Sequence, residues 1–136
     1  MRVEHLVYTL RHLRREVDRL WPNRDRKSDG WIGDAAHAAR VSDHNPDRRG
    51  RVHAVDLDAD GIDTRAVVRA ACLHPATAYV IFDRKIYSRR SGFAARAYSG
   101  TNPHLDHIHV SVLHSKAGRR SRRSWLGLGS EALAQG

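Results

Sequence analysis

The feature that most constrains the fold is an alternation of polar and apolar residues over residues 107–113, which read His-Ile-His-Val-Ser-Val-Leu. Successive side chains of a β-strand point to opposite faces, so this pattern predicts a strand with one buried face. It also places the imidazoles of His107 and His109 on the same face. Two neighbouring imidazoles can supply a metal ligand and an acid or base beside it, although such a pair alone is a weak signal.

A second strand is predicted over residues 52–58, where Asp56 stands among apolar residues. Alternation puts Asp56 on one face with Ala54 and puts His53 on the other. A buried carboxylate is costly unless it is paired or bound to a metal. Asp56 is therefore predicted either to ligate a metal or to form a buried ion pair with an arginine.

Helical periodicity and turn residues predict the other elements. The predicted elements are helices over residues 3–20 and from Asp63 or Thr64 to Leu73, and a hairpin of strands over residues 78–82 and 85–88. Residues 31–51 and 89–100 lack a clean period and are predicted as a long loop and a flexible basic segment.

The chain has 136 residues, the size of one domain. We expect the domain to span residues 1–115. Residues 116–136 are expected to form a basic C-terminal tail with a short helix near residues 131–135, because the composition shifts there to Arg, Ser and Gly. No apolar run approaches the roughly 20 residues of a membrane-spanning helix, so no membrane span is predicted.

The formal net charge is +9, and much of the excess lies in residues 11–27 and 116–123. A basic surface attracts nucleic acid, anionic lipid or anionic cell-wall polymer, and charge alone does not choose among them. The single cysteine excludes an internal disulfide.

His44 precedes the Asp56 strand and follows Ser42 by two positions. Together with Asp56 and a histidine of the late strand, it supplies two imidazoles and one carboxylate. Such a set leaves a fourth position open, as catalytic zinc sites do. The three elements together are a much stronger signal than any one of them.

On these motifs the chain resembles the zinc peptidases that include D-alanyl-D-alanine carboxypeptidases and phage L-alanyl-D-glutamate endolysins. Their motif is SxHxxGxAxD, followed by a late HxH or ExxH. Ser42, His44, Ala54 and Asp56 match the first part, and residues 107–109 match the second.

The strings at residues 42–46 and 102–104 look most like the phage-endolysin branch, and the resemblance covers about residues 21–111. The chain departs from the short motif at residues 45–51, which must loop out, and at Val52, where the motif has glycine.

The resemblance implies that His44, Asp56 and His109 bind one zinc ion. It also implies that His107 is the catalytic base or stabilises the transition state. The ExxH form of the motif would make Asp106 the base instead, but strand alternation predicts that Asp106 points to the opposite face from His109.

Three further residues are candidates for the site. His104 precedes the HxH by three positions and is expected to orient the water or His107. Arg40 is predicted either to bind a substrate carboxylate or the oxyanion, because a guanidinium pairs with either, or to form a structural ion pair. Ser42 is expected to hydrogen-bond to the loop or to a ligand and not to act as a nucleophile.

We therefore expect an α+β fold, with a small antiparallel sheet that carries a zinc site on one face and helices on the other. The expected activity is hydrolysis of a peptide bond in the peptidoglycan stem, by an endopeptidase or a D,D-carboxypeptidase. Zinc would lower the pKa of its bound water to about 7. The expected partners are bacterial peptidoglycan and an anionic wall polymer.

The N-terminal sequence Met-Arg-Val-Glu-His starts with a basic residue but continues into no signal-peptide pattern. We expect synthesis in a host cytoplasm and action on the cell wall after release.

Two other functions fit parts of the sequence. Residues 43–46 superficially resemble the start of an HNH endonuclease, and the positive charge suits DNA. No later Asn-then-His element at helical spacing follows, so nucleic acid is not the expected partner. The other alternative is a non-enzymatic basic protein that binds the wall or belongs to a virion.

Overall fold

The computed structural model describes residues 4–31, 42–100 and 104–127. Its strands are β1 (His5–Leu6), β2 (Arg51–Val52), β3 (Ala54–Asp58), β4 (Thr77–Phe82), β5 (Lys85–Ser88), β6 (Ala95–Ala97) and β7 (His107–Val112). Its helices are α1 (Tyr8–Leu20), α3 (Thr64–Leu73), α4 (Lys116–Arg120) and the 3-10 turn η1 (Arg89–Ser91).

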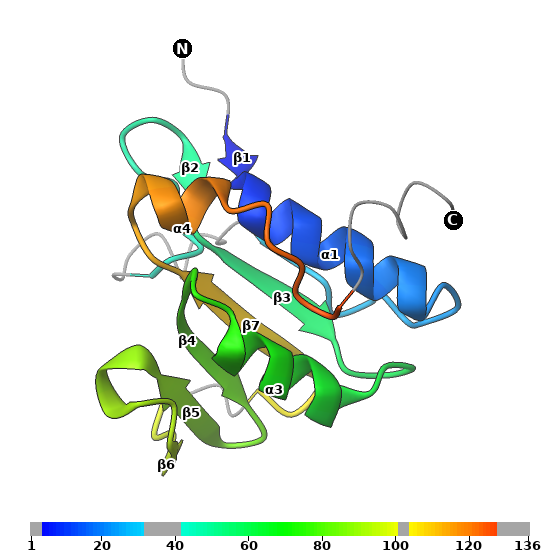
Figure 1. The fold of residues 1–136 in the computed structure, drawn as a ribbon. Helices are drawn as coiled ribbons and strands as arrows, with labels where there is room; N and C mark the ends of the chain where they lie inside the picture. Colours follow the sequence, from blue (N-terminus) through cyan, green and yellow to red (C-terminus); the bar gives the residue numbers. More distant parts are fainter. Residues whose placement is uncertain (1–3, 32–41, 101–103, 128–136) are drawn as a thin grey trace.

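A five-stranded sheet in the order β3-β7-β4-β5-β6 forms the framework, and all of its pairings are antiparallel (Figure 1). Strands β1 and β2 form a separate, short parallel pair. The predicted α+β class is confirmed.

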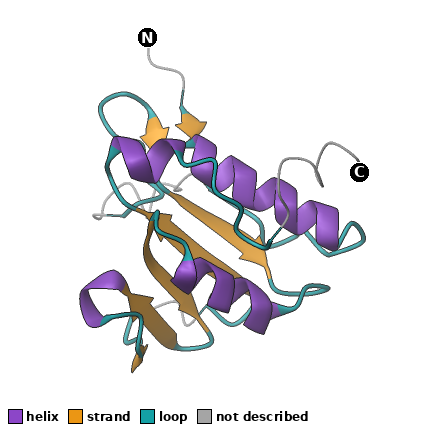
Figure 2. Cartoon of the chain, viewed as in Figure 1, coloured by secondary structure: helices purple, strands orange, loops and turns teal. Residues whose placement is uncertain are grey.

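Helices α1 and α3 pack on one face of this sheet (Figure 2). The core between them consists of apolar side chains from both helices and from the three strands β3, β7 and β4, among them Leu10, Leu13, Val67, Val55, Ile108 and Val80. Each fully buried aliphatic side chain contributes about 1.5–3 kcal/mol by leaving water. Because side chains alternate along a strand, Asp56 and His109 lie on the face that the helices leave open.

Two predicted elements are confirmed together with their local causes. The side chain of Asp63 caps α3 by accepting a hydrogen bond from the backbone N–H of Ala66 at 3.0 Å. The hairpin of β4 and β5 turns at Asp83 and Arg84, whose φ angles of 50° and 62° match the two-residue turn that follows the natural strand twist.

Three predicted boundaries are wrong. Helix α1 begins at Tyr8 and not at residue 3, because residues 5–6 pair with β2 instead. The strand predicted over residues 52–58 is divided at His53 into β2 and β3. The segment 89–100, predicted to be flexible, contains η1 and β6, which pairs with the edge strand β5.

The expected tail beginning at residue 116 is also wrong for residues 116–127, which pack on α1. Trp125 is only 5% exposed, and its indole donates a hydrogen bond to the carbonyl of Thr9. The buried carboxylate of Glu16 accepts bonds from the backbone N–H groups of Trp125 and Leu126 at 2.8 and 3.1 Å. The helix predicted near residues 131–135 lies outside the described residues.

Within the described residues, no helix combines the length and the apolar character needed to cross a lipid bilayer.

Candidate metal centre

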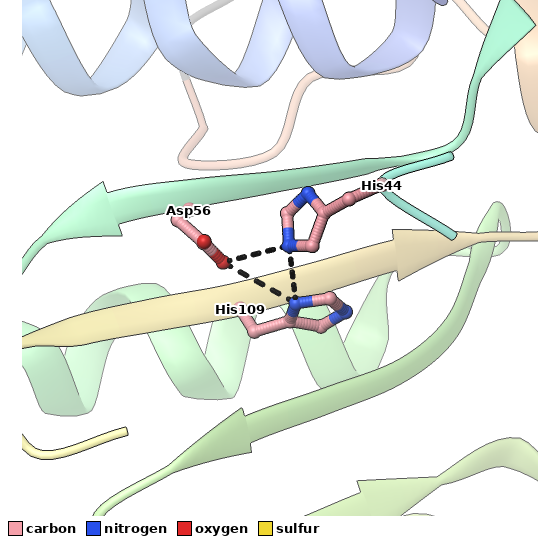
Figure 3. A group of neighbouring side chains, drawn as sticks. All are labelled: His44, Asp56 and His109. Atoms are coloured by element: carbon pink, nitrogen blue, oxygen red, sulfur yellow. Dashed lines mark hydrogen bonds and ion pairs between the residues drawn. The ribbon is translucent and has the colours of Figure 1, made fainter. Parts of the chain in front are cut away.

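The side chains of His44, Asp56 and His109 converge on one point above the open face of the sheet (Figure 3). The Oδ1 atom of Asp56 lies 3.3 Å from Nε2 of His44 and 3.2 Å from Nδ1 of His109. The two ring nitrogens are 3.1 Å apart. The structure therefore brings together all three residues predicted to be metal ligands.

Strand pairing determines the positions of two of these residues. Asp56 and His109 are direct partners in the antiparallel ladder of β3 and β7, so their side chains leave the sheet side by side. The backbone of Asp56 is also bonded on its other edge, where its N–H donates to the carbonyl of Gly30 at 2.7 Å. Asp56 is therefore held between two segments and does not lie at a free edge.

His44 reaches the site from the turn that precedes β2. Its Nδ1 donates a hydrogen bond to the carbonyl of Trp31 at 2.9 Å, and its backbone N–H donates to Oγ of Ser42 at 3.2 Å. A carbonyl can only accept, so Nδ1 of His44 carries a proton, and Nε2 is the nitrogen whose lone pair would be offered to a metal ion.

The outward nitrogen of His109 also has a partner. Its Nε2 lies 2.7 Å from Oγ of Ser111, two residues further along β7. When the hydroxyl accepts this bond, Nδ1 of His109 presents its lone pair to the same point as Nε2 of His44. An outer partner of this kind on a ligating histidine fixes both the tautomer and the ring orientation.

The site's electrostatics suit a cation. Burial would raise the pKa of Asp56, but the imidazoles of His109 and His44 outweigh burial and hold that pKa well below its usual value. Burial lowers the pKa of His109. Burial also opposes protonation of His44, but the Asp56 carboxylate raises the pKa of His44 overall.

The three donors fit a metal ion. Four donors in a tetrahedron with bonds of about 2.0–2.1 Å lie roughly 3.3–3.4 Å apart, close to the 3.1–3.3 Å separations of these atoms. The buried Oδ1 of Asp56 accepts no well-formed hydrogen bond from any described residue. A cation at the centre would satisfy this oxygen and both nitrogens.

His107 stands beside this centre, and with His104 and Asp56 it forms a second group of possible metal ligands. Its Nε2 is 3.8 Å from Oδ2 of Asp56, and its Nδ1 is 2.9 Å from Oδ1 of Asp106. The carboxylate of Asp106 holds the proton on Nδ1, which leaves Nε2 free to take a proton on the side that faces the centre.

The expectation that Asp106 points away from the site is wrong. Strand β7 begins at His107, so alternation does not reach Asp106, and its carboxylate bends back to the His107 ring. Its side chain is 75% exposed. The two residues proposed as alternative bases therefore form a pair in which Asp106 orients His107.

His104 is buried, and its ring lies edge-on to His107 at 4.8 Å and to His109 at 5.7 Å between centroids. Its backbone has a φ of 56°, which turns the chain into β7 at this point. Its position fits the predicted role of orienting His107. Arg40, predicted to bind substrate, lies outside the described residues.

Sequence reasoning missed Tyr79, whose ring stacks on His109 at 5.3 Å between centroids. Burial, together with the nearby charge of Asp43, raises the pKa of Tyr79. Tyr79 lies opposite Ser111 in the pairing of β4 with β7. Nothing in the sequence near Tyr79 indicates that its ring stacks on His109, because this contact depends on which strand pairs with β7.

Comparison of the chain with models of known protein families, with curated proteins and with solved structures found no match. The chemistry of the site therefore rests on its own residues.

His53 lies apart from the centre and predicts an acid sensitivity of the fold. It is 1% exposed, it stacks on His114 at 3.8 Å, and neither ring nitrogen has a hydrogen-bond partner among the described residues. Burial, with a smaller effect from His114, lowers the pKa of His53 to about 4. The same side chain in the unfolded chain has a pKa of about 6.5.

The unfolded chain therefore takes up a proton at His53 between pH 6.5 and 4, whereas the folded chain does not. We expect the free energy of unfolding to fall across this window by about 1–3 kcal/mol. The loss should be complete near pH 4. Urea denaturation at several pH values would measure it, with His53→Leu as the comparison. If both proteins lost stability in parallel, His53 would not be the group responsible.

Proposed function

We propose that this chain is a zinc-dependent peptidase that hydrolyses a peptide bond in the bacterial peptidoglycan stem. One observation carries the proposal: the donor atoms of His44, Asp56 and His109 lie 3.1–3.3 Å apart. These three residues stand in the sequence motifs, and in the chain order, of the zinc peptidases that the chain resembles. Two imidazoles and a carboxylate are a donor set of catalytic zinc.

The proposed chemistry divides between the ion and the protein. A bound zinc ion would supply Lewis-acid activation of water and of the scissile carbonyl. His107 takes up at Nε2 a proton from the attacking water and delivers it to the leaving amine, while Asp106 keeps the other ring nitrogen protonated. His104 limits the movement of the His107 ring by packing edge-on against it.

The proposed substrate is a peptide of the wall, where D-residues exclude ordinary proteases. The positive charge of the protein suits the anionic polymers of that wall. The proposed place of action is the cell wall, after release from the host cell.

Turnover on purified cell walls and on plasmid DNA, with and without a chelator, tests this function. We expect the protein to release new amino groups from walls, to lose this activity in chelator, and to regain it with added zinc. Plasmid DNA should stay intact. Activity that survives complete removal of metal, or cleavage of DNA in place of walls, would contradict the proposal.

A further inference from the structure

A basic hollow lies between the start of α1, the loop before β2 and helix α4, which stand side by side in Figure 1. Its volume is about 440 Å³. Its basic side chains come from three distant parts of the chain: Arg11, Arg49, Arg51, Lys116, Arg119 and Arg120. A second depression, which also includes Arg48, adjoins it through the side chains of Arg49, Arg51 and Arg119.

Among the described residues, Asp47 is the carboxylate that lines this basic region, and most of the basic side chains there have no ion-pair partner. Asp47 pairs with Arg51 at 2.7 Å. Burial opposes ionisation of Asp47, but its bonds to Arg51 lower its pKa to about 2, so this pair stays neutral as a unit. Within residues 4–31, 42–100 and 104–127, neither Arg49 nor Arg119 has a carboxylate partner.

The scaffold beneath the hollow is ordered and not a loose tail. The side chain of Ser115 caps α4 by accepting a bond from the N–H of Gly118 at 3.1 Å. Gly118 packs so closely that a Cβ there would lie 2.2 Å from the carbonyl oxygen of Leu113. Residues 121–127 then anchor the helix through Trp125 and Glu16. The backbone of Arg119 is therefore fixed beside the hollow, and this residue loses less conformational entropy on binding than a residue of a flexible tail would.

The chemistry of the hollow selects its ligand. Guanidinium groups form paired, charge-assisted hydrogen bonds with phosphate oxygens, and several arginines around one concavity favour a group with several such oxygens. A phosphate in a flexible single chain can bend into the hollow. A DNA duplex is stiff over about 150 base pairs and cannot bend its backbone to follow so small a concavity.

We propose that this hollow binds phosphodiester groups of an anionic cell-wall polymer. The choice of wall polymer as the source rests on the proposed peptidase function. One loop contributes to both the candidate metal centre and the hollow, since His44 lies at its start and Arg49 near its end. A wall polymer seated in the hollow would therefore hold the enzyme beside peptides attached to the same wall.

Binding of the intact, zinc-loaded protein to poly(glycerol phosphate) tests the proposal without any turnover. The variant Arg49→Ala/Arg119→Ala removes from the hollow two guanidinium groups that have no carboxylate partner among the described residues. The matched control Arg65→Ala/Arg69→Ala removes two exposed charges from α3. We expect the hollow variant to bind about 10- to 100-fold more weakly at low salt, and the control to bind within about twofold of wild type.

Three outcomes would overturn the proposal. Equal losses in the two variants would mean that only net charge matters. Binding of a DNA duplex as tight as binding of the polymer, at equal phosphate concentration, would point to nucleic acid. No binding of either would show that the hollow is not an anion site. The zinc content of the hollow variant and its cleavage of a soluble stem peptide would be measured in parallel. If both are unchanged, a failure to bind polymer counts against the anion site and not against the peptidase proposal.

Discussion

Replacing His109 by alanine should release the metal and abolish turnover. The Nδ1 atom of His109 lies 3.1–3.2 Å from the other two donor atoms, so its loss leaves one imidazole and one carboxylate. The proposed zinc ion, which would supply several kcal/mol of transition-state stabilisation, would be lost with it, and we expect turnover to fall at least about 1,000-fold.

His53→Ala is the matched control for this variant. His53 is also a buried histidine, but it lies outside the group of possible ligands. Elemental analysis of both purified variants should find zinc in His53→Ala, at one ion per chain, and none in His109→Ala. Circular dichroism would show that both are folded. Equal zinc content in the two folded variants, or full activity in metal-free wild type, would end the assignment.

His107→Ala should keep its zinc and lose turnover by about 100- to 10,000-fold, the range for loss of a general acid or base. His107 approaches Asp56 only to 3.8 Å and presents one ring nitrogen to the centre. Zinc content and the rate on a soluble stem peptide, measured on the same preparation, would separate this catalytic role from that of a ligand. Loss of zinc in His107→Ala would make it a ligand instead.

Asp106→Asn should be milder, with a loss of about tenfold or less. Asparagine still offers an oxygen to Nδ1 of His107, and an exposed carboxylate contributes less orientation than a buried one. If Asp106→Asn abolished turnover with zinc bound while His107→Ala stayed nearly normal, Asp106 would be the base. The assignment of the two residues would then be reversed.

The contribution of the basic residues 116–123 to polymer binding cannot be tested by deleting the chain after Ser115. Such a deletion would remove Trp125 from the core and leave the buried carboxylate of Glu16 without its backbone donors. The deletion would therefore destabilise the fold, because apolar core surface would be exposed to water and hydrogen bonds to Glu16 would be lost. Substitution of single arginines in α4 avoids this loss.

Patterns between near neighbours were enough to determine β7, α3 and the β4–β5 hairpin. Alternation, a capping carboxylate at Asp63 and a two-residue turn act over a few residues, so they can be recognised in the sequence itself. The candidate ligands were also found this way, because their motifs place His44, Asp56 and His109 at recognisable points. That these residues hold a metal stays a prediction.

Only the tertiary structure decided which of these side chains meet. The imidazoles of His44 and His109 are in contact although they are 65 positions apart in the chain. The backbone N–H of Trp125 donates to the carboxylate of Glu16, which is 109 positions away. The stacking of Tyr79 on His109 and the turn of Asp106 toward His107 are equally hidden from the local pattern. The physical reason is that such contacts depend on which strands pair and which faces bury apolar surface, and neither is a property of a short segment.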